Sequence, residues 1–261
     1  MKISPVLTYY DIGLEVTAFS TTRYGGCSTG NYASFNINEY CGDDISCVRR
    51  NRAALCELLG IQDSNLIYPH QTHGVEVEII TADFLNSPAE YQKRCLDGVD
   101  ALITSERGVC IAVSTADCVP ILLYDDAHKV VAAVHSGWRG TAKKNVVGVI
   151  AQLQKSFGCK PSGLKVVMGP AISRDTFEVG QEVYDCFADN GFPMRDIADR
   201  KRERWYVDLK EANRWLLMQS GVLSPNISIS DICTYRQSEE YFSARKLSIQ
   251  SGRILTGIMM S

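Results

Sequence analysis

The stretch that decides the fold is residues 117–124, DCVPILLY, followed after a short polar link by residues 130–140, VVAAVHSGWRG. Both apolar runs are typical of β-strands. The link between them is far too short for a parallel crossover, which needs about a dozen residues or more. The two runs are therefore predicted to form an antiparallel hairpin.

The register of this hairpin brings two reactive side chains together. A turn centred on Asp126 and Ala127 would place Cys118 directly opposite His135. Directly opposed residues on one face have Cβ atoms roughly 4.5 to 5.5 Å apart, which suits two ligands of one metal or a thiol and its base. The alternate apolar residues of both strands then face the other way, so we assign that second face to the core.

A third candidate ligand lies upstream, in residues 69–74, PHQTHG, just before an alternating strand pattern. Two imidazoles and one thiolate are a set that zinc accepts, and three protein ligands leave a fourth position for water or substrate. The sequence therefore predicts a catalytic zinc site made of His73, Cys118 and His135, with His70 as an alternative to His73 that the His-Gly pattern disfavours. Taken singly, a strand cysteine or a lone histidine is more often structural, so the prediction depends on the three coming together.

Length and composition restrict the class of protein. The 261 residues contain no Pro/Gly/Ser-rich linker, so we expect one domain, residues 1–261. The net charge is only −3 and there is no long basic run, which argues against nucleic-acid binding and favours small-molecule partners. Neither a signal-peptide pattern nor a run of roughly 18 to 20 apolar residues is present, so we expect no membrane association and a cytoplasmic location. Ten scattered cysteines without CxxC spacing are expected to be mostly free thiols.

The element pattern favours an α+β fold, a mixed β-sheet sandwich flanked by helices. Helices and strands do not alternate regularly, and neither a GxGxxG nor a GxxxxGK[ST] motif is present. Helices are predicted at residues 44–59, ended by Gly60, at 141–157, begun by Thr141 as N-cap, and at 178–189 and 208–219. Strands are predicted near residues 6–10, 14–20, 75–80, 100–104, 109–114, 120–125, 129–135, 164–168, 226–233 and 253–259.

A series of short blocks, in order along nearly the whole chain, resembles the YfiH family. The blocks are TRYGG (22–26), SFN (34–36), GDD (42–44), NR (51–52), QTHG (71–74), DGVDAL (97–102), ADCVP (116–120), HSGWRG (135–140), GP (169–170), CT (233–234) and YFSAR (241–245). Members of this family have been called multicopper polyphenol oxidases or laccase-domain proteins, and more recently purine nucleoside phosphorylases.

The resemblance implies a mixed-sheet sandwich of the YfiH/CNF-like type, shared with a group of cysteine hydrolases. The family's metal-binding His, Cys and His fall on His73, Cys118 and His135, in agreement with the hairpin argument. Two departures concern loop shape and substrate detail: the segment between His73 and Asp97 is longer than usual, and Lys246 stands where many members carry an arginine.

The resemblance also implies nucleoside chemistry, namely phosphorolysis of adenosine, inosine, guanosine or methylthioadenosine, and deamination of adenosine. A true multicopper oxidase is disfavoured, because a three-copper cluster with its partner site needs many imidazoles and this chain has four histidines. Copper(II) binds most N/S sites more tightly than zinc and could occupy this one in vitro, which keeps a copper-dependent polyphenol oxidase as an alternative.

Several further residues are candidates for the reaction. Arg23 and Arg139 could bind phosphate bidentately. Asp100 is a candidate substrate-binding or proton-carrying carboxylate, with Asp117 as the other choice. One alternative discards the metal and uses Cys118 as nucleophile and His135 as base, in a hydrolase or amidase linked to peptidoglycan editing. The non-enzymatic alternative is a metal-binding or redox-partner protein.

Overall fold

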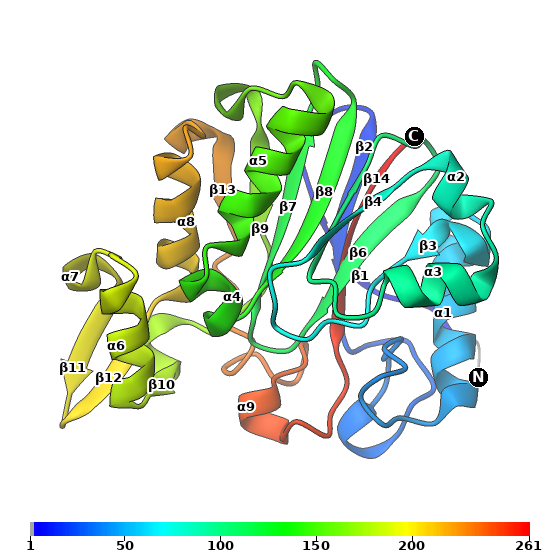
Figure 1. Ribbon diagram of the computed structural model, residues 1–261. Helices are drawn as coiled ribbons and strands as arrows, with labels where there is room; N and C mark the ends of the chain where they lie inside the picture. The colour runs from blue at the N-terminus through cyan, green and yellow to red at the C-terminus, as the bar shows by residue number, and fades with distance from the viewer. Residues whose placement is uncertain (1–2) are drawn as a thin grey trace.

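Two β-sheets packed face to face form the centre of the molecule, and helices cover both outer faces (Figure 1). The computed structural model describes residues 3–261. One sheet has the strand order β1-β2-β14-β6-β3, and the other has the order β13-β9-β7-β8-β5-β4. Both sheets mix parallel and antiparallel pairs, which confirms the predicted α+β sandwich of mixed sheets.

The strands of these two sheets are β1 (Leu7–Tyr10), β2 (Val16–Thr21), β3 (Leu66–Ile67), β4 (Val77–Ile80), β5 (Ala101–Thr104), β6 (Cys110–Thr115), β7 (Val119–Asp125), β8 (Val130–Ser136), β9 (Lys165–Met168), β13 (Ile227–Ile229) and β14 (Ile254–Met260). The helices are α1 (Ile45–Leu59), α2 (Ala82–Leu85), α3 (Ala89–Cys95), α4 (Trp138–Ala142), α5 (Asn145–Phe157), α6 (Gln181–Asp189), α7 (Met194–Ile197), α8 (Leu209–Gln219) and α9 (Ala244–Leu247). A small outlying sheet has the order β10-β12-β11, from Glu178–Val179, Arg204–Val207 and Ala198–Lys201.

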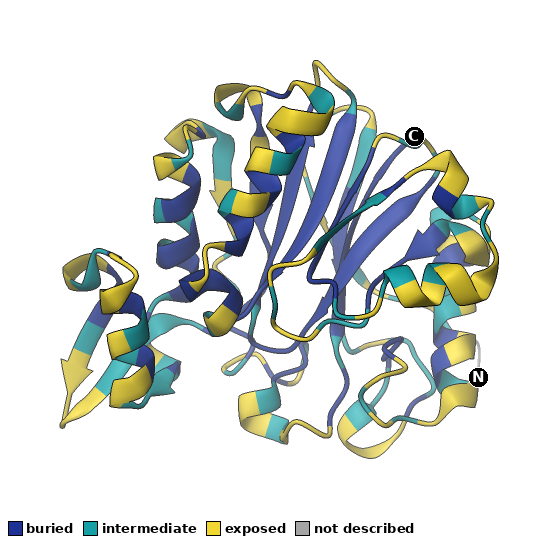
Figure 2. Cartoon of the chain, in the orientation of Figure 1, coloured by how far each residue is buried: buried dark blue, intermediate teal, exposed yellow. Residues whose placement is uncertain are grey.

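The core follows from the two-residue period of the strands. On β6, Ile111 faces the other sheet while Cys110 faces α1, and on β7, Leu122 faces the first sheet while Ile121 faces α5 and α8. The central strands are consequently buried on both faces, whereas the helices are buried on one side only (Figure 2). This arrangement gives the β7–β8 hairpin a rigid setting at the middle of the fold.

The hairpin forms as predicted, but its register was wrong by two residues. Pro120, not Cys118, lies opposite His135, because the turn begins at Asp125. The Asp125 carboxylate accepts hydrogen bonds from the backbone N–H groups of Ala127 and His128 and so fixes a four-residue turn. Because the side-chain period of a strand is two, this error leaves Cys118 and His135 on the same face.

The helix predictions were confirmed at α1 and α8 and corrected elsewhere. Asp44 caps α1 through its bond from Ser46 N, and Gly60 ends it in the left-handed conformation, at φ 68°. The predicted helix 141–157 is two helices, broken at Lys144, where φ is 61°. Thr141 therefore does not begin a helix; it lies inside α4 and donates its hydroxyl to the Gly137 carbonyl at 2.9 Å.

Two smaller differences concern the bounds of one predicted helix and one predicted strand. The predicted helix 178–189 begins only at Gln181, since residues 178–179 pair as β10, and the predicted strand 226–233 shortens to β13. All ten cysteines are free thiols, as expected. Within residues 3–261, each helix is too short or too polar to cross a lipid bilayer.

The helix break packs against the end of β8 through a buried polar cluster, made of Ser136, Thr141, Asn145 and Asn213. Asn145 donates its side-chain N–H to the His135 carbonyl at 2.8 Å, and its Oδ1 lies 2.9 Å from the Ser136 hydroxyl. Asn213 on α8 donates to the Thr141 hydroxyl at 3.1 Å. These bonds tie α4, α5 and α8 to the strand that carries His135.

Replacing Asn145 by Ala should destabilise the protein, because the His135 carbonyl and the Ser136 hydroxyl lose a partner in a site without water access. An unsatisfied buried polar group costs about 1 to 3 kcal/mol of unfolding free energy. Urea unfolding should show that loss, while Gln154→Ala, on the exposed side of the same helix, should stay within about 0.5 kcal/mol of wild type. Equal midpoints for the two variants would contradict the role given to Asn145.

Candidate metal centre

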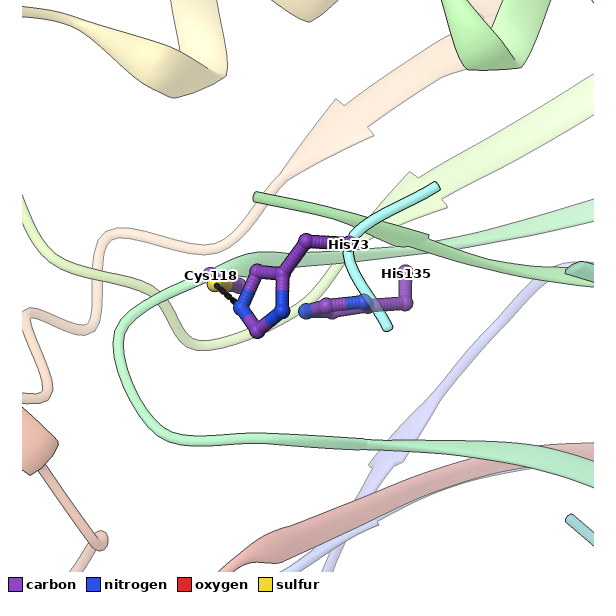
Figure 3. A group of neighbouring side chains, drawn as sticks. All are labelled: His73, Cys118 and His135. Atoms are coloured by element: carbon purple, nitrogen blue, oxygen red, sulfur yellow. Dashed lines mark hydrogen bonds between the residues drawn. The ribbon is translucent and has the colours of Figure 1, made fainter. Parts of the chain in front are cut away.

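The three predicted ligands meet at one end of the β7–β8 hairpin. Cys118 immediately precedes β7, His135 lies near the end of β8, and His73 comes from the loop before β4. One ligand atom of each lies within 4.8 Å of the others. The Cys118 Sγ is 3.9 Å from His73 Nε2, and the two imidazole rings meet edge to face, with centroids 4.8 Å apart (Figure 3).

A buried carboxylate organises two of these ligands. Asp100, just before β5, accepts backbone N–H bonds from Thr72, His73 and Gly74, at 3.2, 3.1 and 2.6 Å. Its Oδ1 also lies 2.6 Å from His135 Nδ1. A nitrogen that close to a carboxylate oxygen carries its hydrogen, which leaves the lone pair of His135 on Nε2. The Asp100–His135 pair thus has the carboxylate–histidine arrangement that supports metal-binding imidazoles in proteins.

The backbone at Gly137 lies very close to two of the three candidate ligands. A Cβ atom added at Gly137 would lie 2.9 Å from Cys118 Sγ and 3.0 Å from His73 Cδ2, so this position has to be glycine. Cys118 follows a residue with a left-handed backbone, Asp117 at φ 88°. Asp117 is held there because its carboxylate accepts the Thr234 hydroxyl and the Arg245 N–H, each at 2.7 Å.

Electrostatics at the site favour a thiolate. Burial alone would raise the pKa of the Cys118 thiol, but the positive charge of His135 and hydrogen bonds from His135 and His73 outweigh it and lower that pKa to about 6. Burial opposes the charged form of His135, yet the Cys118 thiolate and the Asp100 carboxylate raise its pKa to about 9. The pKa of Asp100 is lowered by its bonds to His135 and to the backbone in spite of burial.

These residues fit a zinc ion by their chemistry. Two imidazoles and a thiolate are borderline-soft donors of the type that zinc binds, and one position would stay open for water or substrate. The carboxylate behind His135 supplies the outer support that such sites require. Zinc would therefore be held by His73, Cys118 and His135.

The candidate centre opens into a pocket of about 230 Å³. This volume is slightly below the roughly 300 to 1,000 Å³ of typical ligand pockets, so the pocket suits a small molecule. Its walls come from segments far apart in the sequence and include Asn38, Tyr40, His70, Thr115, Ile249 and Arg253. A larger hollow of about 430 Å³ lies on the other side of Tyr40 but does not reach the three ligands.

The other predicted site residues do not line this pocket. Arg23 donates to the carbonyls of Ala33 and Ser238, and its guanidinium packs over the Phe242 ring. Arg139 is exposed and stacks on Trp138, 4.2 Å from the ring centroid. Asp100 lies behind His135 with a side chain that is 1% exposed. The structure thus gives Asp100 a positioning role and brings neither arginine to the three ligands.

Sequence reasoning missed two features of the pocket wall. Arg253, just before β14, is the arginine that lines the pocket, and two of its nitrogens donate to the carbonyls of Ser251, Gly252 and Ile249. His70, the alternative ligand, stacks on Tyr40, and its Nδ1 lies 2.7 Å from the Asp97 carboxylate. No sequence motif indicated that Arg253 lines the pocket. The spacing between His70 and Asp97 did not predict that they pair.

Comparison with known proteins identifies one matching family model and several relatives of similar sequence. A family model described as multi-copper polyphenol oxidoreductase laccase matches residues 17–261. A relative named purine nucleoside phosphorylase, from Bacteroides thetaiotaomicron, is 46% identical over 248 residues, covering 94% of this chain and 92% of the relative. A relative named adenosine deaminase RL5, from an unknown prokaryotic organism, is 39% identical over 245 residues, covering 93% of each chain.

Solved structures agree with this placement. The hypothetical protein YfiH from Bacillus licheniformis superposes with a TM-score of 0.92 at 26% identity, covering 99% of this chain and 97% of the other. YlmD from Geobacillus stearothermophilus superposes with a TM-score of 0.90 at 32% identity, covering 96% and 94%. On the strength of its fold, its sequence blocks and these matches, the chain belongs to the YfiH family of laccase-like proteins.

Proposed function

We propose that this protein is a zinc-dependent purine nucleoside phosphorylase that acts on adenosine, inosine, guanosine and methylthioadenosine, and that also deaminates adenosine. The observation that carries the proposal is the convergence of His73, Cys118 and His135, backed by Asp100, on a pocket for a small ligand. The printed names of the relatives, purine nucleoside phosphorylase and adenosine deaminase, support the same substrates. We assign the activity to one catalytic domain, in the cytoplasm, where free thiols persist.

The three ligands form a preorganised cation site in this proposal. Asp100 holds the Nδ1 proton of His135 and fixes the loop that carries His73. At neutral pH the lowered pKa of Cys118 favours the thiolate, and the proton that His135 holds at its raised pKa would leave as a cation binds. When bound, zinc supplies a Lewis acid that stabilises developing negative charge and makes water more acidic.

Phosphorolysis also needs a cation that holds phosphate against the anomeric carbon. A phosphate oxygen forms the new bond to that carbon as the bond to the purine nitrogen breaks. Among the described residues that line the pocket, Arg253 is the one lysine or arginine. Its hydrogen bonds to backbone carbonyls fix the plane of the guanidinium group. We therefore assign phosphate binding to Arg253 in place of Arg23 and Arg139.

Two further groups on the pocket wall suit a polar substrate. The Thr115 hydroxyl is buried and, among the described residues, has no hydrogen-bond partner, so a sugar hydroxyl or a base nitrogen would satisfy it. His70 is the pocket imidazole outside the candidate centre and is paired with Asp97. We assign the proton transfers of deamination to His70, since Asp100 is buried behind His135.

A metal-free cysteine hydrolase is the second candidate, because the lowered pKa of Cys118 next to His135 also describes an activated nucleophile. The copper alternative keeps the same three ligands but has little support as a multicopper enzyme. His70 pairs with Asp97 and His128 lies in the turn at the far end of the β7–β8 hairpin, so neither adds to the candidate centre.

The first prediction separates the zinc enzyme from the metal-free hydrolase. Cys118→Ala should lower the zinc content by about one ion per chain and abolish phosphate-dependent release of purine base, because a thiolate ligand is lost. Metal analysis and chromatography of inosine incubated with phosphate measure both. Cys186→Ala, at a half-buried thiol outside the site, is the matched control and should behave as wild type.

Chelator treatment of the wild-type protein completes this test. Turnover should disappear when zinc is stripped and return when zinc is added back. Turnover that survives complete removal of the metal would contradict the zinc enzyme and favour the cysteine nucleophile.

The second prediction concerns the carboxylate behind His135. Asp100→Asn should weaken zinc binding about 10- to 100-fold, the usual effect of losing an outer partner of a metal-binding histidine. Competition with a chromophoric chelator gives the dissociation constant. Asp97→Asn, which alters the carboxylate paired with His70, should leave zinc affinity unchanged; equal affinities for both variants would contradict the role of Asp100.

The third prediction tests the phosphate site. Arg253→Met should reduce kcat/KM for phosphate about 10- to 100-fold, because a charge-assisted hydrogen bond contributes about 1.5 to 3 kcal/mol. Adenosine deamination, which uses no phosphate, should be nearly unaffected. Arg139→Met should change neither rate. A phosphate KM that is the same in both variants would remove Arg253 from the site.

A further inference from the structure

A second set of three ligand-type side chains lies at the other end of the β7–β8 hairpin. Asp125 ends β7, His128 lies in the turn, and Cys159 follows α5; one ligand atom of each lies within 4.8 Å of the others. At about 3.3 Å per residue, the length of β7 puts this trio roughly 20 Å from Cys118. It is therefore separate from the candidate metal centre.

The Asp125 carboxylate is buried, with a side chain that is 3% exposed, and each of its oxygens has partners. Oδ1 accepts the backbone N–H groups of Ala127 and His128, at 2.9 and 3.1 Å. Oδ2 lies 3.0 Å from His128 Nδ1, and the Cys159 Sγ lies within 4.8 Å of the ligand atoms of both residues. Lys129, the nearest cation along the turn, is directed to Asp126 and Glu15 instead.

A cation could bind between the three ligand atoms, which lie within 4.8 Å of one another. The carboxylate lies beside an imidazole and a thiol, and the thiol becomes a ligand when its proton leaves. Carboxylate oxygen, imidazole nitrogen and thiolate sulfur are all donors that zinc accepts. Cys159 is 3% exposed, whereas the His128 side chain is 37% exposed, so the trio is buried on one side and open to solvent on the other.

The backbone holds the three side chains in place without a metal. Gly158 ends α5 in the left-handed conformation, at φ 72°, and turns the chain so that Cys159 reaches the hairpin. An ideal Cβ at Gly158 would lie 3.7 Å from His128 Nε2, so the imidazole is packed against this turn. In Figure 1 the tip of the hairpin and the end of α5 lie together at the top of the molecule.

We propose that Asp125, His128 and Cys159 form a second zinc site, which fastens the tip of the β7–β8 hairpin to the connection between α5 and β9. Three protein ligands and one water from the open side complete a tetrahedral ion. The thiol proton of Cys159 leaves to solvent as the metal binds, and the imidazole proton moves to Nε2. No step of the reaction at the first centre depends on this second ion.

The test uses cobalt(II) in the Cys118→Ala protein, because a sulfur-to-cobalt charge-transfer absorption in that background cannot come from the first centre. The band should appear on titration with cobalt and disappear when zinc is added. It should be absent in Cys118→Ala/Cys159→Ser, where serine keeps a hydrogen-bond donor beside Asp125. Cys118→Ala/Cys186→Ser, the matched control at a thiol outside both trios, should keep the band.

A second variant distinguishes the loss of a zinc ligand from misfolding of the protein. His128→Gln changes a partly exposed side chain and should weaken zinc affinity more than about 100-fold, beyond the roughly 10- to 100-fold cost of losing an outer partner alone. Zinc should also raise the melting temperature of Cys118→Ala but not that of Cys118→Ala/Cys159→Ser. No cobalt band in Cys118→Ala, or a band that survives Cys159→Ser, would overturn the second site and show a hydrogen-bonded turn only.

Discussion

The candidate site depends on the hydrogen bonds that the Asp100 carboxylate accepts. This carboxylate takes three N–H groups from the loop 72–74 and the Nδ1 proton of His135, so one buried charge fixes two ligands that come from different parts of the chain. The Asp100 carbonyl also accepts the His135 backbone N–H at 2.8 Å. Without this carboxylate, four polar groups beside the candidate centre would lack a partner, which is why the charge is stable at 1% exposure.

The fold around Asp100 holds the three candidate ligands in place although two of them lie outside strands. Cys118 immediately precedes β7 and His135 lies in β8, two paired strands that are buried on both faces, and His73 is tied to the residue before β5 through Asp100. Rigid strands hold ligand positions more precisely than loops can. The polar cluster around Asn145 adds the helices to the same strand, so the three layers meet at His135.

Much of the fold and the three ligands could be predicted, because strand period, helix caps and the ADCVP and HSGWRG blocks are local signals. The register could not, since Asp125 and Asp126 can each begin a turn and only the tertiary structure selects Asp125. The break at Lys144 also lacked a signal, because lysine is a good helix former and because the residues that bond to the two helices beside the break, Ser136 and Asn213, lie on other elements. Arg253 could not be predicted either, because it is the tertiary fold that brings this residue to the pocket.

The residues of the pocket wall come from different segments of the chain than the candidate ligands at its floor. The floor is the candidate metal centre at the end of the β7–β8 hairpin, whereas Tyr40, His70, Ile249 and Arg253 come from connections that lie outside this hairpin. Connections tolerate substitution and insertion better than buried strands do. Substitutions in these segments can therefore change which small molecule fits the pocket, while the three candidate ligands keep their positions. Similar chains carry the names purine nucleoside phosphorylase and adenosine deaminase, and a change confined to the pocket wall is one physical route to such a difference.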